Sequence, residues 1–100
     1  MLGKEIERPE IISECNGGEV KEGHTVFLST TRSDAQVYYT TDGSLPLPGE
    51  PNTHKYNPGN GVQLNSPGLL FVRAVAMMRG ILPSKILTSK YAPHLYIYSS

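Results

Sequence analysis

The 100-residue chain has few of the residues that commonly carry chemistry or anchor a protein in a membrane. Its only cysteine is Cys15, so no disulfide can form within the chain. It has no tryptophan, and no run approaches the roughly 18 apolar residues of a membrane-spanning helix. Nine basic side chains balance nine acidic ones, which leaves no basic surplus for nucleic acid or an anionic membrane. We therefore expect neither nucleic acid nor a membrane as a partner.

The N-terminus and the lone thiol predict where the protein resides. The first ten residues, MLGKEIERPE, are charged and lack the apolar centre of a signal peptide. A single free thiol suits a reducing compartment better than an oxidising one. We expect an intracellular, cytoplasmic protein. An extracellular origin is the alternative if the chain is an excised domain, because excision removes any targeting segment.

Turn-forming residues are abundant and separate short apolar runs. Ten Gly and eight Pro punctuate the chain, and no segment keeps a helical period. Alternation of apolar and polar residues predicts strands at 9–15, 24–30, 35–41, 62–64, 69–78 and 84–91. The chain is too short for more than one domain, and this pattern predicts an all-β, antiparallel, immunoglobulin-like β-sandwich of six to seven strands.

The boundaries of the domain follow from the same pattern. Residues 1–8 form an N-terminal extension, 9–92 the sandwich and 93–100 a tail that adds an edge strand in one interpretation. Small Ala74 and Ala76 opposite larger residues allow two sheets to pack at about 10 Å. The side chains expected in the core are Ile11, Val26, Leu28, Val37, Tyr39, Val62, Leu64, Leu70, Val72, Ala74, Ala76, Leu87 and Tyr91.

The stretch VYYTTDGSLP, residues 37–46, ends a strand at Asp42-Gly43. Asp42 could serve as a catalytic acid or a calcium ligand, but a glycosidase needs a second carboxylate and calcium needs several oxygen ligands. The acids nearest in sequence are Asp34 and Glu50, and the chain has no calcium-loop pattern. The favoured interpretation is a structural turn, in which Asp42 accepts bonds from backbone N–H groups and Gly43 adopts a positive φ.

Several of these stretches together form a family pattern. They are Pro9 with Ile11, Val26 with Leu28, YYTTDGSLP, Tyr56 with Pro58, Val62 with Leu64, VRAVA at 72–76, Gly80, Ser84 and Tyr91. On these residues the chain resembles the immunoglobulin-like (fibronectin-III-like) module that ends chitobiases and β-hexosaminidases. The resemblance implies this fold and an accessory role without chemistry, because members owe their enzymatic activity to separate domains. The Pro- and Gly-rich loop at 47–60 and the ending PHLYIYSS depart from the pattern.

No other residues form a recognisable catalytic or metal-binding set. His24, His54 and His94 are widely spaced, with one cysteine to join them, so a zinc site is not expected. Cys15 has no basic cluster or helix N-terminus beside it to activate a thiolate, which favours a small buried or edge-strand side chain. The sequence predicts no catalytic residue, no metal and no cofactor, and hence a protein that is not an enzyme.

A candidate interaction surface arises from side chains on the outward faces of the strands. These are Phe27, Tyr38, Phe71, Val75 and Met77, which form an exposed apolar patch if their strands are neighbours. The alternative is that the 45–61 loop or the C-terminal tail covers this patch.

The tail also carries candidate interface residues, Tyr96 and Tyr98. Pro93 is expected to break the ladder with the preceding strand. The tail is then expected to join a sheet edge, either in its own chain or in another chain. Self-pairing is favoured, because an intramolecular edge is always at high effective concentration.

Two functions follow from these observations. The first is a non-catalytic module that positions or joins neighbouring domains or protein partners through a sheet face. The alternative is a carbohydrate-binding accessory module of a chitin- or hexosamine-processing enzyme, which would use exposed tyrosines. The lack of tryptophan weakens this alternative, and an enzyme that uses Asp42 is a distant third.

Overall fold

The computed structural model describes residues 8–14, 17–21, 23–65 and 68–94, and all regular elements in these ranges are strands. No helix within them could span a membrane. The strands are β1 (Ile11–Ser13), β2 (Gly18–Lys21), β3 (His24–Val26), β4 (Leu28–Thr30), β5 (Gln36–Thr40), β6 (His54–Lys55), β7 (Val62–Leu64), β8 (Leu70–Met77) and β9 (Leu87–His94). The all-β prediction is confirmed, with more strands than expected.

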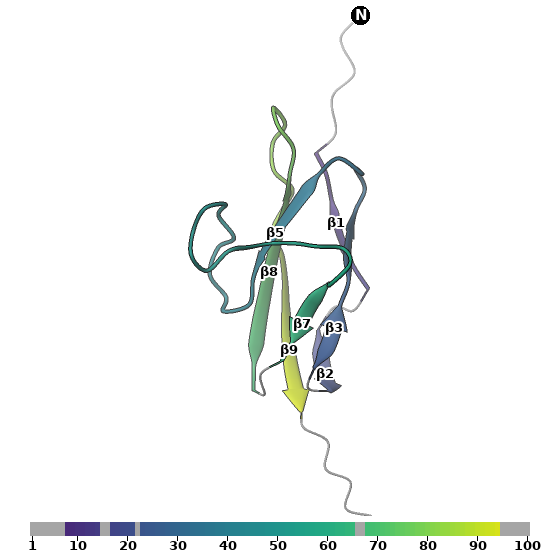
Figure 1. The fold of residues 1–100 in the computed structure, drawn as a ribbon, viewed down its shortest axis with the longest axis vertical. Helices are drawn as coiled ribbons and strands as arrows, with labels where there is room; N and C mark the ends of the chain where they lie inside the picture. The colour runs from purple at the N-terminus through teal and green to yellow at the C-terminus, as the bar shows by residue number, and fades with distance from the viewer. Residues whose placement is uncertain (1–7, 15–16, 22, 66–67, 95–100) are drawn as a thin grey trace, which may run out of the picture.

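The strands form two facing layers, as in a sandwich (Figure 1). One layer is a five-stranded sheet in the order β2-β9-β8-β5-β6. In the other layer β4 pairs with β1 and β3 pairs with β7. Because Phe27 alone separates β3 from β4, these two strands act as one, with β1 along one half and β7 along the other.

The expectation of a purely antiparallel sandwich is wrong at one pair of strands. β2 runs parallel to β9, with Gly18 opposite Tyr91 and Lys21 opposite His94. The chain changes layer between β1 and β2, and Gly17 there has φ +102°. A Cβ on Gly17 would lie 2.8 Å from the Lys90 carbonyl oxygen, so the crossing needs a residue without a side chain. The sequence analysis missed β2, because only one of its four residues is apolar.

Strand β9 continues past the point at which the sequence predicted a break. Pro93 lies within β9, opposite Val20 of β2. Pairing between β8 and β9 ends at Leu70 and Tyr91, so Pro93 has no β8 partner that would need its missing N–H. The predicted ladder break at Pro93 is therefore wrong, and the strand ends at His94.

The predicted core is confirmed. Every side chain assigned to it lies in the buried cluster or packs against that cluster. In register, Val37 faces Ala76 and Tyr39 faces Ala74 across β5 and β8, so small residues oppose larger ones. The structure adds Tyr56 to the buried cluster, with Val20 and Ala35 packed against it. Tyr56 was missed because it lies in a Pro- and Gly-rich segment without alternation.

Tyr56 holds the segment that crosses from the five-stranded layer to β7 (Figure 1). Its backbone N–H donates to the Val37 carbonyl at 2.8 Å, which extends the pairing begun by β6. Its hydroxyl accepts a bond of 2.9 Å from the Leu28 N–H in the opposite layer. One buried side chain therefore ties the two layers together at this edge.

The crossing segment ends at Gly61, where a side chain would not fit. A Cβ at this position would lie 2.5 Å from Thr25 Cγ2 and 3.1 Å from the Val26 carbonyl oxygen, at φ +67°. We expect Gly61→Ala to lower the free energy of unfolding by about 2–4 kcal/mol, from backbone strain plus overpacking, as measured by urea denaturation.

A matched variant separates the two causes of this loss. Gly49→Ala has a positive φ of +93° but no atom within 4 Å of the added Cβ. It should therefore show the backbone cost alone. Equal losses in the two variants would contradict tight packing around Gly61.

Candidate interaction surface

Asp42 forms a turn directly after β5. Its Oδ1 accepts bonds from the Ser44 N–H at 3.0 Å and from the Ser44 hydroxyl at 2.6 Å. Gly43 between them has φ +84°. The bonds from the Ser44 hydroxyl and N–H hold the pKa of the Asp42 carboxyl below 3.8, its ordinary value, and the nearby His54 adds to this lowering.

This environment is opposite to the one that an acid catalyst needs. A glycosidase acid has a raised pKa so that it carries a proton at neutral pH, whereas the pKa of Asp42 is lowered. Among the described residues, no three His, Cys, Asp or Glu side chains come close enough to hold a metal ion. The hydrogen bonds of Asp42 therefore support a structural role in the turn.

The turn is the first part of a longer loop, residues 41–53. Hydrogen bonds attach this loop to the five-stranded sheet. The Gly43 N–H donates to the Phe71 carbonyl at 3.1 Å, and Arg73 Nη1 donates to the Gly43 carbonyl at 3.2 Å. The Thr40 hydroxyl donates to the Ser44 carbonyl at 2.6 Å. Asp42-Gly43 thus starts a loop whose base is bonded to both β5 and β8.

The outer part of the 41–53 loop has its own hydrogen bonds. The Glu50 N–H donates to the Leu47 carbonyl at 3.1 Å, and the Thr53 N–H donates to the Glu50 carbonyl at 3.0 Å. The Thr53 hydroxyl accepts a bond of 2.9 Å from the Leu47 N–H. These bonds give the loop one defined shape.

The candidate surface residues do not form one patch. Tyr38 and Val75 are register partners on the outer face of β5 and β8, and Phe71 and Met77 share that face. Phe27 instead lies between β3 and β4 in the other layer. Phe27 is therefore separated from the other four residues, because the core lies between the two layers.

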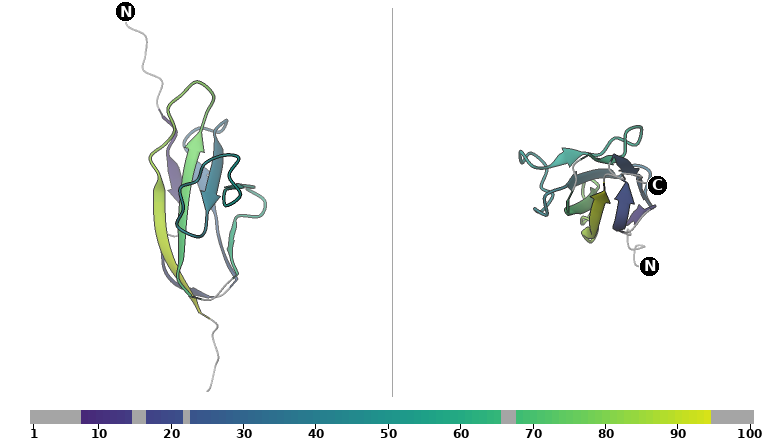
Figure 2. Two further views of the ribbon diagram at one scale, coloured as in Figure 1. Left: turned by 90° about the vertical axis from the view of Figure 1, so that its left-hand side faces the viewer. Right: turned by 90° about the horizontal axis from the view of Figure 1, so that it is seen from below.

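The 41–53 loop lies over the outer face of β5 and β8 (Figure 2). Pro46 in the loop is buried, and so are Thr40 and Val75 on that face. Val75 is only 3% exposed, so it is not available to a partner. Phe71 stays 42% exposed, although the base of the loop is bonded to its carbonyl group. Val75 therefore does not belong to an exposed patch.

Some candidate residues lie beyond what the structure describes. Tyr96 and Tyr98 are outside the described residues, and so is Cys15. The two ways in which the tail could pair with a sheet edge therefore stay predictions.

The tyrosines of the described strands and loops offer no flat, exposed platform. Tyr38 and Tyr39 are half-buried, and Tyr56 and Tyr91 are buried. The Tyr39 ring packs against His54 at 5.3 Å and edge-on against Tyr56 at 6.3 Å. Burial, with a smaller contribution from Tyr56, raises the pKa of Tyr39. Tyr39, Tyr56 and Tyr91 thus belong to the core or pack against it, while Tyr38 lies on the outer face of β5.

The histidines also lie apart. His24 is on β3 opposite Leu64, and His54 is on β6 in the other layer. The buried Nε2 of His24 has no hydrogen-bond partner among the described residues.

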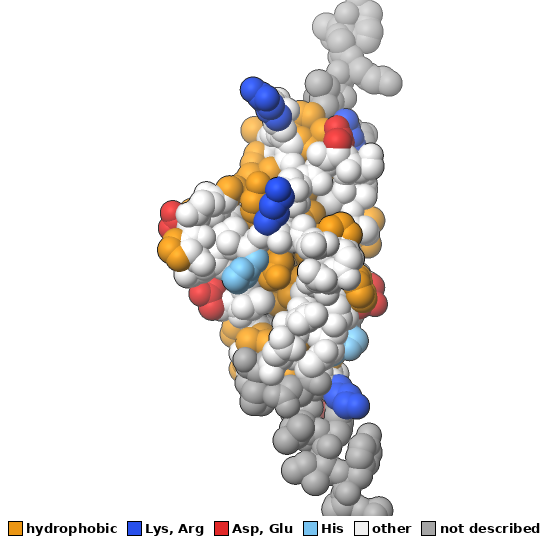
Figure 3. Space-filling model, in the orientation of Figure 1, with side chains coloured by type: hydrophobic (Ala, Val, Ile, Leu, Met, Phe, Trp, Pro, Cys, Tyr) orange, Lys and Arg blue, Asp and Glu red, His pale blue; other side chains and the backbone are white. Residues whose placement is uncertain are grey.

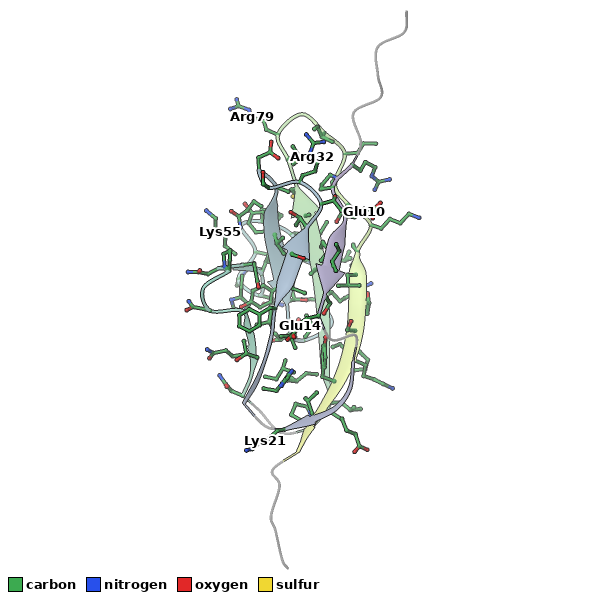
Figure 4. All side chains as sticks on the ribbon, turned by 90° about the vertical axis from the view of Figure 1, so that its right-hand side faces the viewer. Glu10, Glu14, Lys21, Arg32, Lys55 and Arg79 are labelled. Carbon is green, nitrogen blue, oxygen red and sulfur yellow. The ribbon has the colours of Figure 1, made fainter. Side chains whose placement is uncertain are left out.

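Charged side chains are spread around the sandwich (Figure 4). Those labelled come from six different strands or connections and are Glu10, Glu14, Lys21, Arg32, Lys55 and Arg79.

Comparison with known proteins finds one family. Residues 15–88, well over half of the chain, match the family described as chitobiase/beta-hexosaminidase C-terminal domain. The chain belongs to this family. The family is a C-terminal accessory module of these enzymes, which is consistent with a non-catalytic role. Neither the comparison with curated proteins nor that with solved structures gave a match.

The match covers the Asp42 turn, the 41–53 loop and most of the strands. It therefore supports the resemblance drawn from YYTTDGSLP and VRAVA. Sequence reasoning missed two exposed side chains of the loop, Leu45 and Leu47. Their only signal in the sequence is their place among prolines, in a loop longer than a turn requires.

Proposed function

We propose that this member of the family is a non-catalytic module that positions or joins neighbouring domains or protein partners. The observation that carries the proposal is the environment of Asp42, the one candidate catalytic group. Its hydrogen bonds to Ser44 lower its pKa and build a loop, which leaves it unsuited to donate a proton. The family match supports the proposal, since it is to an accessory domain.

The way in which the chain enters the sandwich also supports a positioning role. Arg8 Nε donates to the Pro83 carbonyl at 2.7 Å, and Pro9 is fully buried. Glu10 and Thr31 exchange two bonds, at 3.0 and 3.1 Å. These contacts fix the direction in which the chain enters the sandwich. The entry point lies at the end of the sandwich opposite the end of β9 (Figure 1). Any segment attached at Arg8 would be held far from one attached at His94.

An assay with a chromogenic N-acetylglucosaminide tests the non-catalytic proposal. We expect no hydrolysis by the intact protein and no difference between it and Asp42→Asn. Hydrolysis that disappears in Asp42→Asn would overturn the proposal.

Titration with chitooligosaccharides tests the carbohydrate-binding alternative. We expect no saturable change in tyrosine fluorescence, because no described tyrosine is fully exposed. A saturable change would favour the alternative. The cytoplasmic location expected from the sequence stays a prediction.

A further inference from the structure

Two exposed leucines stand on the 41–53 loop. Leu45 is 49% exposed and Leu47 is 51% exposed, while Pro46 between them is buried. Pro46 therefore lies against the rest of the protein, while the leucines on either side of it are both open to solvent.

The loop that carries these leucines is held in advance of any binding event. It is bonded to β8 through Gly43 and Arg73, and closed on itself through Leu47 and Thr53. Pro46, Pro48 and Pro51 further restrict its backbone. A partner that binds this loop would not have to order it, which removes a large part of the usual entropic cost of binding.

The charges of the loop indicate what kind of surface would fit it. Residues 41–53 contain two acidic side chains, Asp42 and Glu50, and no lysine or arginine. Both acidic side chains are exposed. On the projecting loop at the left of Figure 3, apolar side chains lie between acidic ones. The complementary surface is an apolar pocket with basic residues around it.

We propose that the 41–53 loop is a docking element that inserts Leu45 and Leu47 into an apolar pocket with a basic rim on a partner protein. This inference rests on the proposed function. It adds which surface of the module binds a partner protein and what chemistry the partner's surface has. The acidic charges disfavour an anionic membrane as the occupant, because both would carry the same sign of charge.

Selection from a displayed library of small folded scaffold proteins with randomised surface residues tests the proposal on the intact chain, because a folded scaffold can present a pocket. We expect the selected binders to combine apolar residues with Lys or Arg. The double variant Leu45→Ser with Leu47→Ser should bind them at least about tenfold more weakly, because buried apolar anchors carry most of the affinity of an interface. Glu50→Lys should weaken binding by several-fold, and added salt should do the same.

A matched variant controls for exposed leucines in general. Leu69 and Leu82 are exposed to 60% and 67% and lie outside the loop. Leu69→Ser with Leu82→Ser should bind the selected scaffold proteins as the unmodified protein does. Both double variants should keep the urea midpoint of the parent, which shows that they fold. Equal loss of binding in both, or selection of no scaffold protein whose binding depends on the loop, would overturn the inference.

Binding of the loop to something other than a partner protein would also overturn the inference. Leucine-dependent flotation with phosphatidylcholine vesicles would indicate a lipid surface. A dimer seen by light scattering that dissociates in the Leu45→Ser, Leu47→Ser variant would indicate a second copy of the chain. These results leave the glycosidase and chitooligosaccharide assays unaffected, so failure of the docking inference can be told apart from failure of the proposed function.

Discussion

Replacing Tyr56 with alanine should lower the free energy of unfolding by about 3–5 kcal/mol, the range for removing a large buried aromatic side chain. Tyr56 is only 6% exposed, and its hydroxyl accepts from the Leu28 N–H of the facing layer. The variant therefore loses packing and leaves a buried donor without its partner. Urea denaturation followed by circular dichroism measures the loss.

Tyr56→Phe isolates the hydrogen bond from the packing. We expect it to cost about 1–3 kcal/mol, because the buried Leu28 N–H is left unsatisfied while the ring remains. Tyr38→Phe is the matched control, since Tyr38 is half-buried on the outer face and its hydroxyl has no hydrogen bond with the described residues. A loss in Tyr56→Phe no larger than in Tyr38→Phe would show that the bond between the layers contributes nothing.

Ala74→Leu should also destabilise the sandwich strongly, by about 1–3 kcal/mol through overpacking. Ala74 is completely buried, and its register partners are Tyr39 on β5 and Leu87 on β9. A leucine at this position would push into the space that these larger side chains fill. The shift of the urea midpoint measures the effect.

Ser29→Leu controls for the added volume. Ser29 is exposed on β4, so the same large side chain should fit there with little change in stability. A neutral Ala74→Leu would mean that the two layers separate easily at this point and that the core is not close-packed around Ala74.

Alternation along the chain was enough to identify most of the core, because a strand buried on one face must repeat apolar residues at every second position. Val72, Ala74 and Ala76 on β8 show this pattern clearly. The Asp42-Gly43 turn could also be predicted, since an aspartate that bonds to nearby backbone and a glycine at positive φ are local properties. The alternation and the turn both depend only on residues that are close together in the chain, so both can be predicted from the sequence.

The candidate surface could be predicted only in part. The sequence assigned Tyr38, Phe71, Val75 and Met77 to outward faces, and the structure places them together on β5 and β8. It could not show that Phe27 lies in the other layer or that Val75 is buried. Both depend on which strands pair and on where a loop folds, and neither leaves a periodic mark in the sequence.

The sequence by itself determined the class of fold, the inward faces of the strands and the turn after β5, because each follows from periodicity or from the local chemistry of a few adjacent residues. Only the tertiary structure decided the change of layer before β2, the parallel pairing of β2 with β9 and the role of Tyr56. It also decided that Leu45 and Leu47 face solvent while Pro46 is buried. Each of these depends on contacts between residues distant in sequence, where packing and hydrogen bonds across the two layers outweigh local preference.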